Sequence, residues 1–225
     1  MTVLVAGSRR RPRPSTAAPW GSSTRSTRLC TGAIAATPSP SLDLVLSRLS
    51  SAADHSKLWF AMAGALALKP GRPRRAALVG VASIGLASAT ANLVGKGLLR
   101  RARPDRAGVT VPAGRMVRMP DSTSFPSGHS ASAFAFATAV GDELPLAWLP
   151  LHALAAAITY SRVHTGVHYP GDVLVGSLMG TGAAVAVRYT SHALTHRRAR
   201  GRRRPSGPAF GSESSSRQAT PVSAT

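Results

Sequence analysis

The sequence predicts an all-α protein, a polytopic membrane bundle of about five to six helices. Residues 76–95 form twenty residues without a charge, which is long enough to cross a bilayer as a helix. Several shorter apolar segments rich in Ala, Gly and Leu follow, separated by polar loops. No segment shows the alternation of apolar and polar residues that is typical of a strand.

Six segments are predicted to be helical: 41–54, 58–68, 76–95, 127–141, 144–161 and 173–187. The first places Leu42, Leu46 and Leu49 at helical spacing, with charged residues between them. Such a helix lies in a membrane interface or caps a soluble core. Residues 76–95 are a membrane span or, alternatively, a buried helix of a soluble bundle. The last three segments are short for spans, and Gly176 and Gly180 have the spacing that lets two helices approach closely.

The basic residues of the chain are concentrated outside the helical segments. Residues 1–40 contain six Arg and no acid, and residues 188–225 contain eight Arg and one Glu, so these ends carry most of the net charge of +20. Both ends lack an apolar period, which predicts disordered basic tails at 1–40 and 191–225 around a single domain at 41–190. No apolar h-region follows the Arg9–Arg11 run, which argues against a signal peptide.

Composition narrows the possible partners and sites. Cys30 is the only cysteine, so an internal disulfide or a cysteine-based metal site is excluded. A basic protein can bind nucleic acid or an anionic membrane, but aromatic residues are only 5% of the chain and offer little surface for stacking bases. We therefore expect membrane lipids as partners and no nucleic acid.

The distribution of charge also predicts a topology. The basic loop 69–75 and the basic tail from Arg188 fall on one side of the bundle by alternation, and the positive-inside tendency places that side in the cytoplasm. Regions 96–128 and 161–172 then share the outer, extracytoplasmic face of a plasma membrane protein. The Arg-rich N-terminal tail fits this orientation less well.

Three polar clusters fall on that predicted outer face. They are Lys96 to Arg103-Pro104, Pro126-Ser127-Gly128-His129, and Ser161-Arg162 to His168 and Asp172. Cationic side chains at membrane helix ends are costly unless they bind something. Arg103 and Arg162 offer forked donors and Lys96 a point charge, which suits a multiply negative, tetrahedral group. Ser127 and Gly128 begin a helix, so their backbone N–H groups can also point at its oxygens.

The last cluster contains a candidate nucleophile. A His near a carboxylate can be held in one tautomer, which leaves its other ring nitrogen free to attack or to move a proton. Pro170 is suited to a first helical turn, so His168 would precede a helix and Asp172 would lie in its first turn. The alternative is an ordinary helix start with a capping Asp.

Together, the three clusters resemble the type 2 phosphatidic acid phosphatase (PAP2) or lipid phosphate phosphatase superfamily. The pattern of a Lys, six residues and Arg-Pro, then Pro-Ser-Gly-His, then Ser-Arg, five residues, His, three residues and Asp is present without departure across residues 58–187. The resemblance implies a membrane phosphatase that hydrolyses a lipid phosphate or diphosphate, such as one of polyprenyl type. It also implies an acid-phosphatase type of reaction with no metal and no cofactor.

The resemblance also implies a role for each matching residue. His168 would attack phosphorus to form a phosphohistidine, Asp172 would hold its ring, and His129 would protonate the leaving alkoxide and then help to activate water. The substrate-binding residues would neutralise the phosphoryl oxygens: Lys96, Arg103, Ser127, Gly128 and Arg162.

Other charged residues near these clusters receive weaker interpretations. His164 would line the site, whereas His152 would serve packing. Arg100, Arg101 and Arg106 would steer an anionic headgroup or contact lipid phosphates. His192 and His196 belong to the basic tail.

Two other functions remain as alternatives. The same residues could hold vanadate in a haloperoxidase-like oxidoreductase, although the charge-free run 76–95 argues against such a soluble enzyme. A non-enzymatic basic membrane protein could bind nucleic acid or anionic lipid through its Arg-rich tails.

Overall fold

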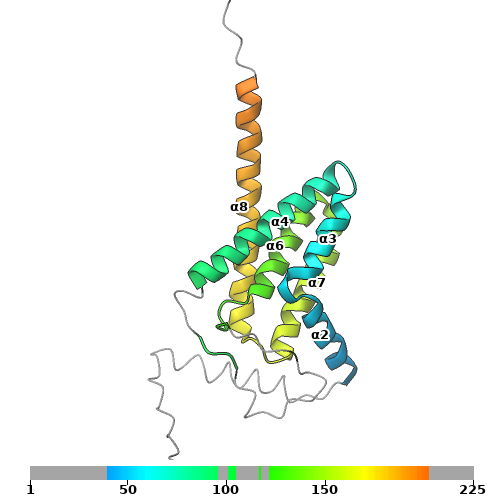
Figure 1. Ribbon diagram of the computed structural model, residues 1–225, viewed down its shortest axis with the longest axis vertical. Helices are drawn as coiled ribbons and strands as arrows, with labels where there is room; N and C mark the ends of the chain where they lie inside the picture. The colour runs from blue at the N-terminus through cyan, green and yellow to red at the C-terminus, as the bar shows by residue number, and fades with distance from the viewer. Residues whose placement is uncertain (1–39, 96–100, 105–116, 118–121, 203–225) are drawn as a thin grey trace, which may run out of the picture. The chain divides into compact units, whose positions relative to one another are not determined.

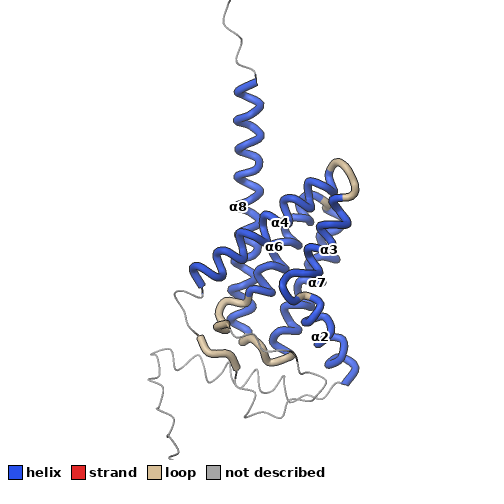
Figure 2. Tube along the Cα trace, in the orientation of Figure 1, coloured by secondary structure: helices blue, strands red, loops and turns tan. Residues whose placement is uncertain are grey.

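The computed structural model describes residues 40–95, 101–104, 117 and 122–202, and all regular structure among them is helical (Figure 1; Figure 2). The elements are α2 (Pro40–Ala52), η1 (Asp54–Ser56), α3 (Lys57–Ala67), α4 (Arg72–Thr90) with its π-helical end η2 (Ala91–Gly95), α6 (Gly128–Glu143), α7 (Pro145–His164) and α8 (Pro170–Arg202). The predicted all-helical fold is confirmed. Each of the six predicted segments corresponds to one α-helix.

Local chemistry explains where several helices begin. Pro145 and Pro170 occupy the first positions of α7 and α8, where a missing N–H donor costs nothing. The Ser127 side chain caps α6 by accepting a hydrogen bond from the Ser130 amide at 3.4 Å. α4 follows Gly71, whose φ of 87° is a conformation that L side chains rarely adopt.

The core lies between α3, α4, α6 and α7 and consists mainly of small residues. Two of its largest fully buried side chains, Trp59 of α3 and Phe136 of α6, contact each other with ring centroids 5.2 Å apart. Around this pair lie buried alanines from several helices: Ala63, Ala76, Ala77, Ala133, Ala137 and Ala155. Small side chains let the helix backbones approach closely, which is the packing mode of membrane bundles.

The close approach predicted for Gly176 and Gly180 is present between α8 and α6. A Cβ atom at Gly176 would overlap the carbonyl oxygen of Ser127, and one at Gly180 would overlap that of Ala131. The contact continues through a second cluster of buried alanines: Ala87, Ala131, Ala135 and Ala183. The first turns of α8 are therefore held directly against the start of α6.

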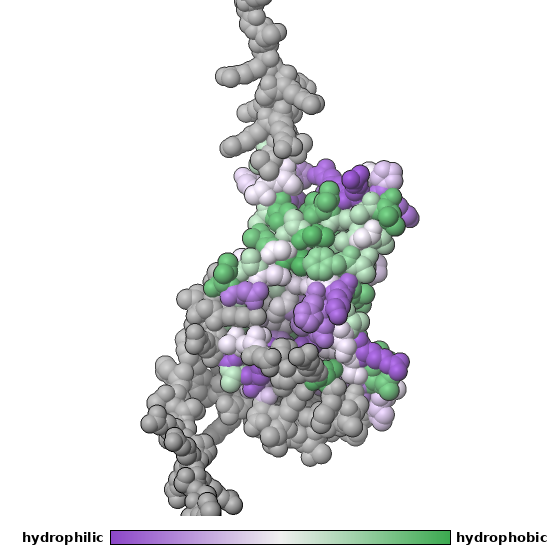
Figure 3. Space-filling view, viewed as in Figure 1, coloured by the Kyte–Doolittle hydropathy of each residue, from purple (hydrophilic) through white to green (hydrophobic). Residues whose placement is uncertain are grey.

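Two helical stretches, Arg72–Leu93 and Pro170–Ala193, are long and apolar enough to cross a membrane. Figure 3 shows, on one face, a zone of hydrophobic side chains between two hydrophilic zones. Large apolar side chains are exposed on several helices, among them Phe60, Leu78, Val81, Leu86, Leu149, Leu174, Leu178 and Val185. Such a surface fits contact with lipid.

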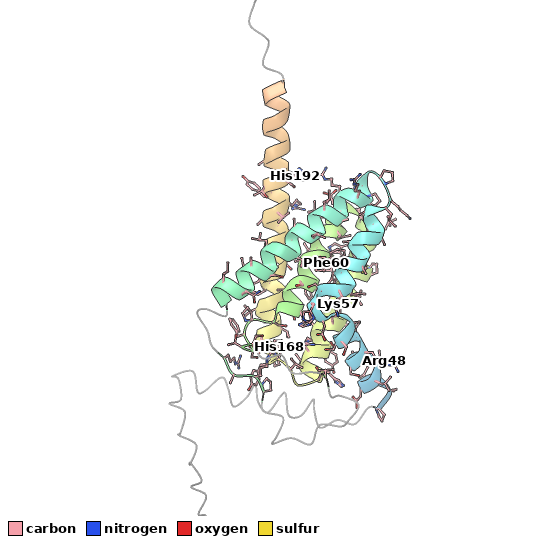
Figure 4. All side chains as sticks on the ribbon, in the orientation of Figure 1. Arg48, Lys57, Phe60, His168 and His192 are labelled. Carbon is pink, nitrogen blue, oxygen red and sulfur yellow. The ribbon has the colours of Figure 1, made fainter. Side chains whose placement is uncertain are left out.

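The two ends of the bundle carry different polar groups. The turn between α3 and α4 contains Lys69 and lies at one end, where Arg75 pairs with Glu143 at 3.1 Å. Figure 4 shows His168 at the end away from that turn, on the side of α2 and Arg48. The described parts of the two predicted outer regions, 96–128 and 161–172, therefore share one end of the bundle.

The chain divides into two compact units, Met1–Tyr189 and Thr190–Thr225. Helix α8 itself continues to Arg202, so residues 191–202 are helical and the prediction of disorder there was wrong. No Gly or Pro interrupts the sequence between Gly182 and Gly201, which lets the helix continue. The rest of the predicted tails, 1–39 and 203–225, lies outside the described residues.

Candidate active site

Most of the predicted site residues lie together at the end of the bundle that contains His168. They come from the segment 101–104, the start of α6, the end of α7, the loop 165–169 and the first turn of α8. Lys96 lies outside the described residues, as do Arg100 and Arg106, so the predictions for them are untouched.

The loop before α8 places His168. Gly166 adopts a φ of 64° and ends α7, and the amides of Val167 and His168 then donate to the Arg162 carbonyl oxygen at 3.0 and 3.1 Å. The His168 side chain is only 2% exposed. Its backbone is thus tied to the last turn of the helix that carries Arg162.

The hydrogen bonds of the His168 ring define its tautomer. Nδ1 lies 2.8 Å from the carbonyl oxygen of Ser124, and a carbonyl can only accept, so Nδ1 carries the hydrogen in the neutral ring. Nε2 keeps its lone pair and lies 3.3 Å from Nη1 of Arg103. Burial, together with the Arg103 and Arg162 guanidinium groups, lowers the pKa of His168 to about 4, against the opposing effect of Asp172. The ring is therefore neutral at physiological pH, as a nucleophile must be.

Asp172 supports the His168 ring indirectly, through Ser124, and not by the direct contact that the sequence suggested. Its Oδ2 is 3.8 Å from His168 Nδ1, which is longer than a hydrogen bond, and accepts instead from the Ser124 hydroxyl and from the Tyr169 amide. Oδ1 pairs with Arg101 at 3.0 Å. Asp172 fixes Ser124 through its hydroxyl, and the Ser124 carbonyl oxygen in turn fixes the His168 ring.

Arg101 and Arg103 lie on one short segment but have different partners. The Arg101 guanidinium covers the Tyr169 ring at 4.2 Å while it pairs with Asp172, so it holds the start of α8 rather than steering a headgroup. Arg103 donates to the carbonyl oxygens of Ser122 and Val167 at 2.8 and 3.1 Å. These bonds fix its Nη1 beside Nε2 of His168, to which Nη1 donates at 3.3 Å, where a phosphoryl oxygen needs a cation.

Arg162 and His129 meet an acidic residue that the sequence analysis did not select. Arg162 is 1% exposed, donates from Nη1 to the Ser50 hydroxyl at 2.6 Å, and lies 3.7 Å from Oδ1 of Asp54. His129 Nε2 donates to the same Asp54 oxygen at 2.9 Å. This hydrogen bond lowers the pKa of Asp54, with burial opposing it, so the carboxylate stays charged.

Ser127 and Gly128 lie at the start of α6 as predicted. The Ser127 amide is occupied by the backbone carbonyl oxygen of Asp172 at 3.0 Å, which ties the starts of α6 and α8 together. A Cβ at Gly128 would meet nothing within 4 Å, so the backbone there is open to an approaching group. Substrate binding by these two residues stays a prediction.

His164 lies one step outside this group. Its Nε2 pairs with Oδ1 of Asp43 at 2.8 Å, and both side chains are almost fully buried. Asp43 belongs to α2, so this pair fastens α2 to the end of α7. His152 stacks on Trp148 with ring centroids 4.3 Å apart, a packing role as expected.

Sequence reasoning missed Ser124, Ser50, Asp54 and Asp43. One signal for the last three was present: positions 43, 50 and 54 differ by seven and four residues and therefore share one face of a helix. The sequence analysis noted Asp43 and Asp54 only as charged residues between the leucines and did not connect them with the site. Ser124 acts through a backbone carbonyl oxygen, for which side-chain identity gives no signal. Among the described residues, no three His, Cys, Asp or Glu side chains gather to hold a metal ion.

Comparison with known proteins agrees with this geometry. Residues 76–196 match the family model of the PAP2 superfamily, a region that contains all three clusters. The chain belongs to the PAP2 superfamily. It is therefore a phosphatase, a phosphoric monoester hydrolase.

The chain is also similar to individual PAP2 proteins. It is 41% identical over 138 residues to the decaprenylphosphoryl-5-phosphoribose phosphatase of Mycobacterium tuberculosis, covering 59% of this chain and 71% of that protein. Its fold is similar to that of Aquifex aeolicus LpxE (TM-score 0.59, 24% identity, 72% of this chain and 93% of that one). It is also similar to a transmembrane PAP2 type phosphatidylglycerolphosphate phosphatase from Bacillus subtilis (TM-score 0.61, 21% identity, 77% and 88%). These two structures support the PAP2 membrane fold.

Proposed function

We propose that this PAP2 phosphatase removes the phosphate from a polyprenyl-type lipid phosphate through a phosphohistidine formed on His168. The strongest support is the Nε2 atom of His168, which keeps its lone pair because Nδ1 donates to Ser124, and which faces Arg103. A buried imidazole with one occupied nitrogen and a cation beside the other is suited to attack a phosphoryl group.

In the first step, His168 Nε2 attacks phosphorus, and the bond from phosphorus to the ester oxygen breaks. The leaving alkoxide takes a proton from His129 and departs as the free alcohol. Arg103 and Arg162 stabilise the charge that spreads over the phosphoryl oxygens. Because Lys96 matches the first motif of the family, we assign it as a further cation that contacts the phosphoryl group.

In the second step, water attacks the phosphohistidine. His129, now neutral, accepts the proton from the water, the bond between nitrogen and phosphorus breaks, and inorganic phosphate leaves. Both groups return to their starting states, so no redox partner or cofactor is consumed. Catalysis then rests on fixed charge and on alignment.

The lipid class is proposed from the relatives and from the surface of the bundle. The M. tuberculosis relative is named for a decaprenyl-linked phosphosugar, and exposed apolar residues on α4 and α8 can contact a long prenyl chain. The basic turn between α3 and α4 lies at the other end of the bundle, which supports a site on the extracytoplasmic face of a bacterial plasma membrane.

Phosphate release by purified protein in detergent tests the substrate class. The panel contains a prenyl monophosphate, a prenyl diphosphate, a prenylphosphoryl pentose 5-phosphate, phosphatidic acid and free pentose 5-phosphate. We expect the prenyl-linked substrates to give the highest kcat/KM, and equal rates on free pentose phosphate would contradict a lipid substrate. Activity should survive a chelator, whereas a strong loss would contradict the metal-free reaction.

Trapping the intermediate tests the chemistry. After rapid quenching in base, radiolabelled phosphate from the substrate should remain on wild-type protein and be released by acid, as expected for phosphohistidine. His168→Ala should carry no label and show no turnover. Label that persists in this variant would overturn the assigned nucleophile.

A further inference from the structure

The short segment between α2 and α3 reaches the candidate acid of the site. Asp54, the first residue of η1, accepts from His129 Nε2 at 2.9 Å and lies 3.7 Å from Nη1 of Arg162. Among the described residues, the interactions of Asp54 with these side chains all involve Oδ1, and the side chain is 39% exposed. Asp54 lies outside residues 76–196, the part of the chain that matches the PAP2 family model.

The backbone around Asp54 is unusual. His55 and Ser56 both have positive φ, 55° and 58°, in the left-handed region that residues with a Cβ rarely adopt. Two such residues in succession persist only where their surroundings hold them. Trp59 anchors the following turn in the core at 1% exposure, and the Ser56 amide donates to the Ala53 carbonyl oxygen at 3.2 Å. The chain thus holds a strained turn that presents a carboxylate to His129.

We propose that Asp54 is a positioning residue of the phosphatase site, which holds His129 by Nε2 and favours the protonated form of the ring, so that Nδ1–H donates to the leaving oxygen. This inference rests on the proposed role of His129 as the acid. A carboxylate accepts the Nε2 hydrogen in both charge states of the ring, which leaves Nδ1 as the atom whose proton can be transferred and returned.

The charges around His129 explain why a carboxylate is needed there. Burial lowers the pKa of His129, and the positive charges of Arg162 from α7 and Arg103 from the segment 101–104 lower it further, whereas the hydrogen bond to Asp54 raises it. His55 from η1 acts on Asp54, while Asp172 at the start of α8 is engaged by Arg101. Within the described part of the chain, Asp54 is therefore the acidic group that contacts His129 and offsets these cations.

The same pair has a second consequence for binding. A bare carboxylate beside a phosphate pocket would repel the substrate, whereas a carboxylate paired with a protonated imidazole is neutral as a unit. Asp54 thus places a proton at the leaving-group side of the site without cancelling the positive charge of Arg103 and Arg162. Replacing Asp54 should therefore change kcat and its pH dependence more than KM.

The first test compares Asp54→Asn with wild type in the pH dependence of kcat/KM on a prenyl monophosphate. The amide oxygen can still accept from Nε2, but the charge is lost, so the basic limb should move by about one to three pH units toward lower pH. The acid limb, which reports His168, should stay in place. Asp54→Glu should restore the basic limb at least in part. An unchanged basic limb in Asp54→Asn would overturn the proposal.

A second test varies the leaving group. A prenyl alkoxide needs a proton to leave, but p-nitrophenolate does not, so the loss of kcat in Asp54→Asn should be about ten- to a hundredfold on the prenyl ester at neutral pH and much smaller on p-nitrophenyl phosphate. Equal losses on both substrates would show that Asp54 serves structure alone. Asp142→Asn is the matched control, since Asp142 pairs with Arg188 at the other end of α6.

A third variant separates positioning from the anchoring of α2. Asp43→Ala removes the partner of His164 and loosens the same helix without touching His129. If it reproduces the shifted basic limb, the effect belongs to α2 and the proposal fails. If wild type forms no phosphohistidine, or His129→Ala keeps wild-type kcat, then the proposed function fails first, independently of the Asp54 result.

Discussion

Gly176→Ala tests whether the contact between α8 and α6 sets the geometry of the site. A Cβ at this position would overlap the Ser127 carbonyl oxygen and lie 3.3 Å from the Ser130 Cβ. The obstructing oxygen belongs to the backbone, so no change of rotamer relieves the overlap. The starts of the two helices must therefore move apart.

The size of the effect follows from what these helix starts hold. Overpacking of a close contact costs roughly 1–3 kcal/mol of stability. The Ser127 amide donates to the Asp172 carbonyl oxygen at 3.0 Å, and the Asp172 carboxylate fixes Ser124, so a displacement reaches the His168 ring. A misplacement of about 1 Å can reduce a rate on the order of a hundredfold. We expect Gly176→Ala to lose both stability and kcat.

Gly182→Ala provides the matched control. Gly182 lies on the same helix, and a Cβ there meets nothing within 4 Å. Thermal unfolding in detergent, followed by tryptophan fluorescence, and phosphate release should both match wild type for this variant. If Gly176→Ala also unfolds at the wild-type temperature and keeps full kcat, the close contact does not control the site.

Three further outcomes follow from the described contacts. Because the pKa of His168 is about 4, the acid limb of kcat/KM should fall near pH 4, and a limb near 6.5 would contradict a buried neutral ring. The His168 imidazole takes up a proton at higher pH in the unfolded chain than in the folded one. Roughly 3 kcal/mol of stability should therefore be lost as the pH falls from about 6.5 to 4. In denaturant titrations, His168→Gln should remove this pH dependence. Asp43→Ala leaves Nε2 of the buried His164 without its carboxylate partner and should cost roughly 1–3 kcal/mol, seen as a lower unfolding midpoint than in Asp142→Asn.

The helical fold was predictable because each element has a local signal. Charge-free runs mark α4 and the later helices, prolines mark the starts of α7 and α8, and the Gly176 and Gly180 spacing marks the contact with α6. Residues 191–202 were predicted to be disordered because their Arg content is high. Composition reports whether a segment can be buried, whereas a helix continues wherever no Gly or Pro stops it.

The site was predictable only where its chemistry lies in side chains at fixed spacing. His129, Arg162, His168 and Asp172 lie together at one end because alternation of helices places their clusters there. The direct partner of His168 was not predictable, since the Ser124 carbonyl oxygen is a backbone atom. Nor were the different partners of Arg101 and Arg103, because the sequence alone does not show which of two nearby arginines meets Asp172.

Helix α2 shows that the leucine spacing of an amphipathic helix does not reveal what its polar face contacts. Its apolar residues Leu42, Leu44 and Val45 are 42%, 47% and 60% exposed, whereas Asp43 and Ser50 are buried. In water this arrangement would be costly, but at a membrane interface the outer face meets lipid, and the inner face can bind the polar end of the bundle. Asp43 then meets His164, Ser50 meets Arg162, and Asp54 meets His129 just beyond the helix. The polar residues of this helix therefore face the bundle, where they contact His164 and residues proposed to take part in the reaction.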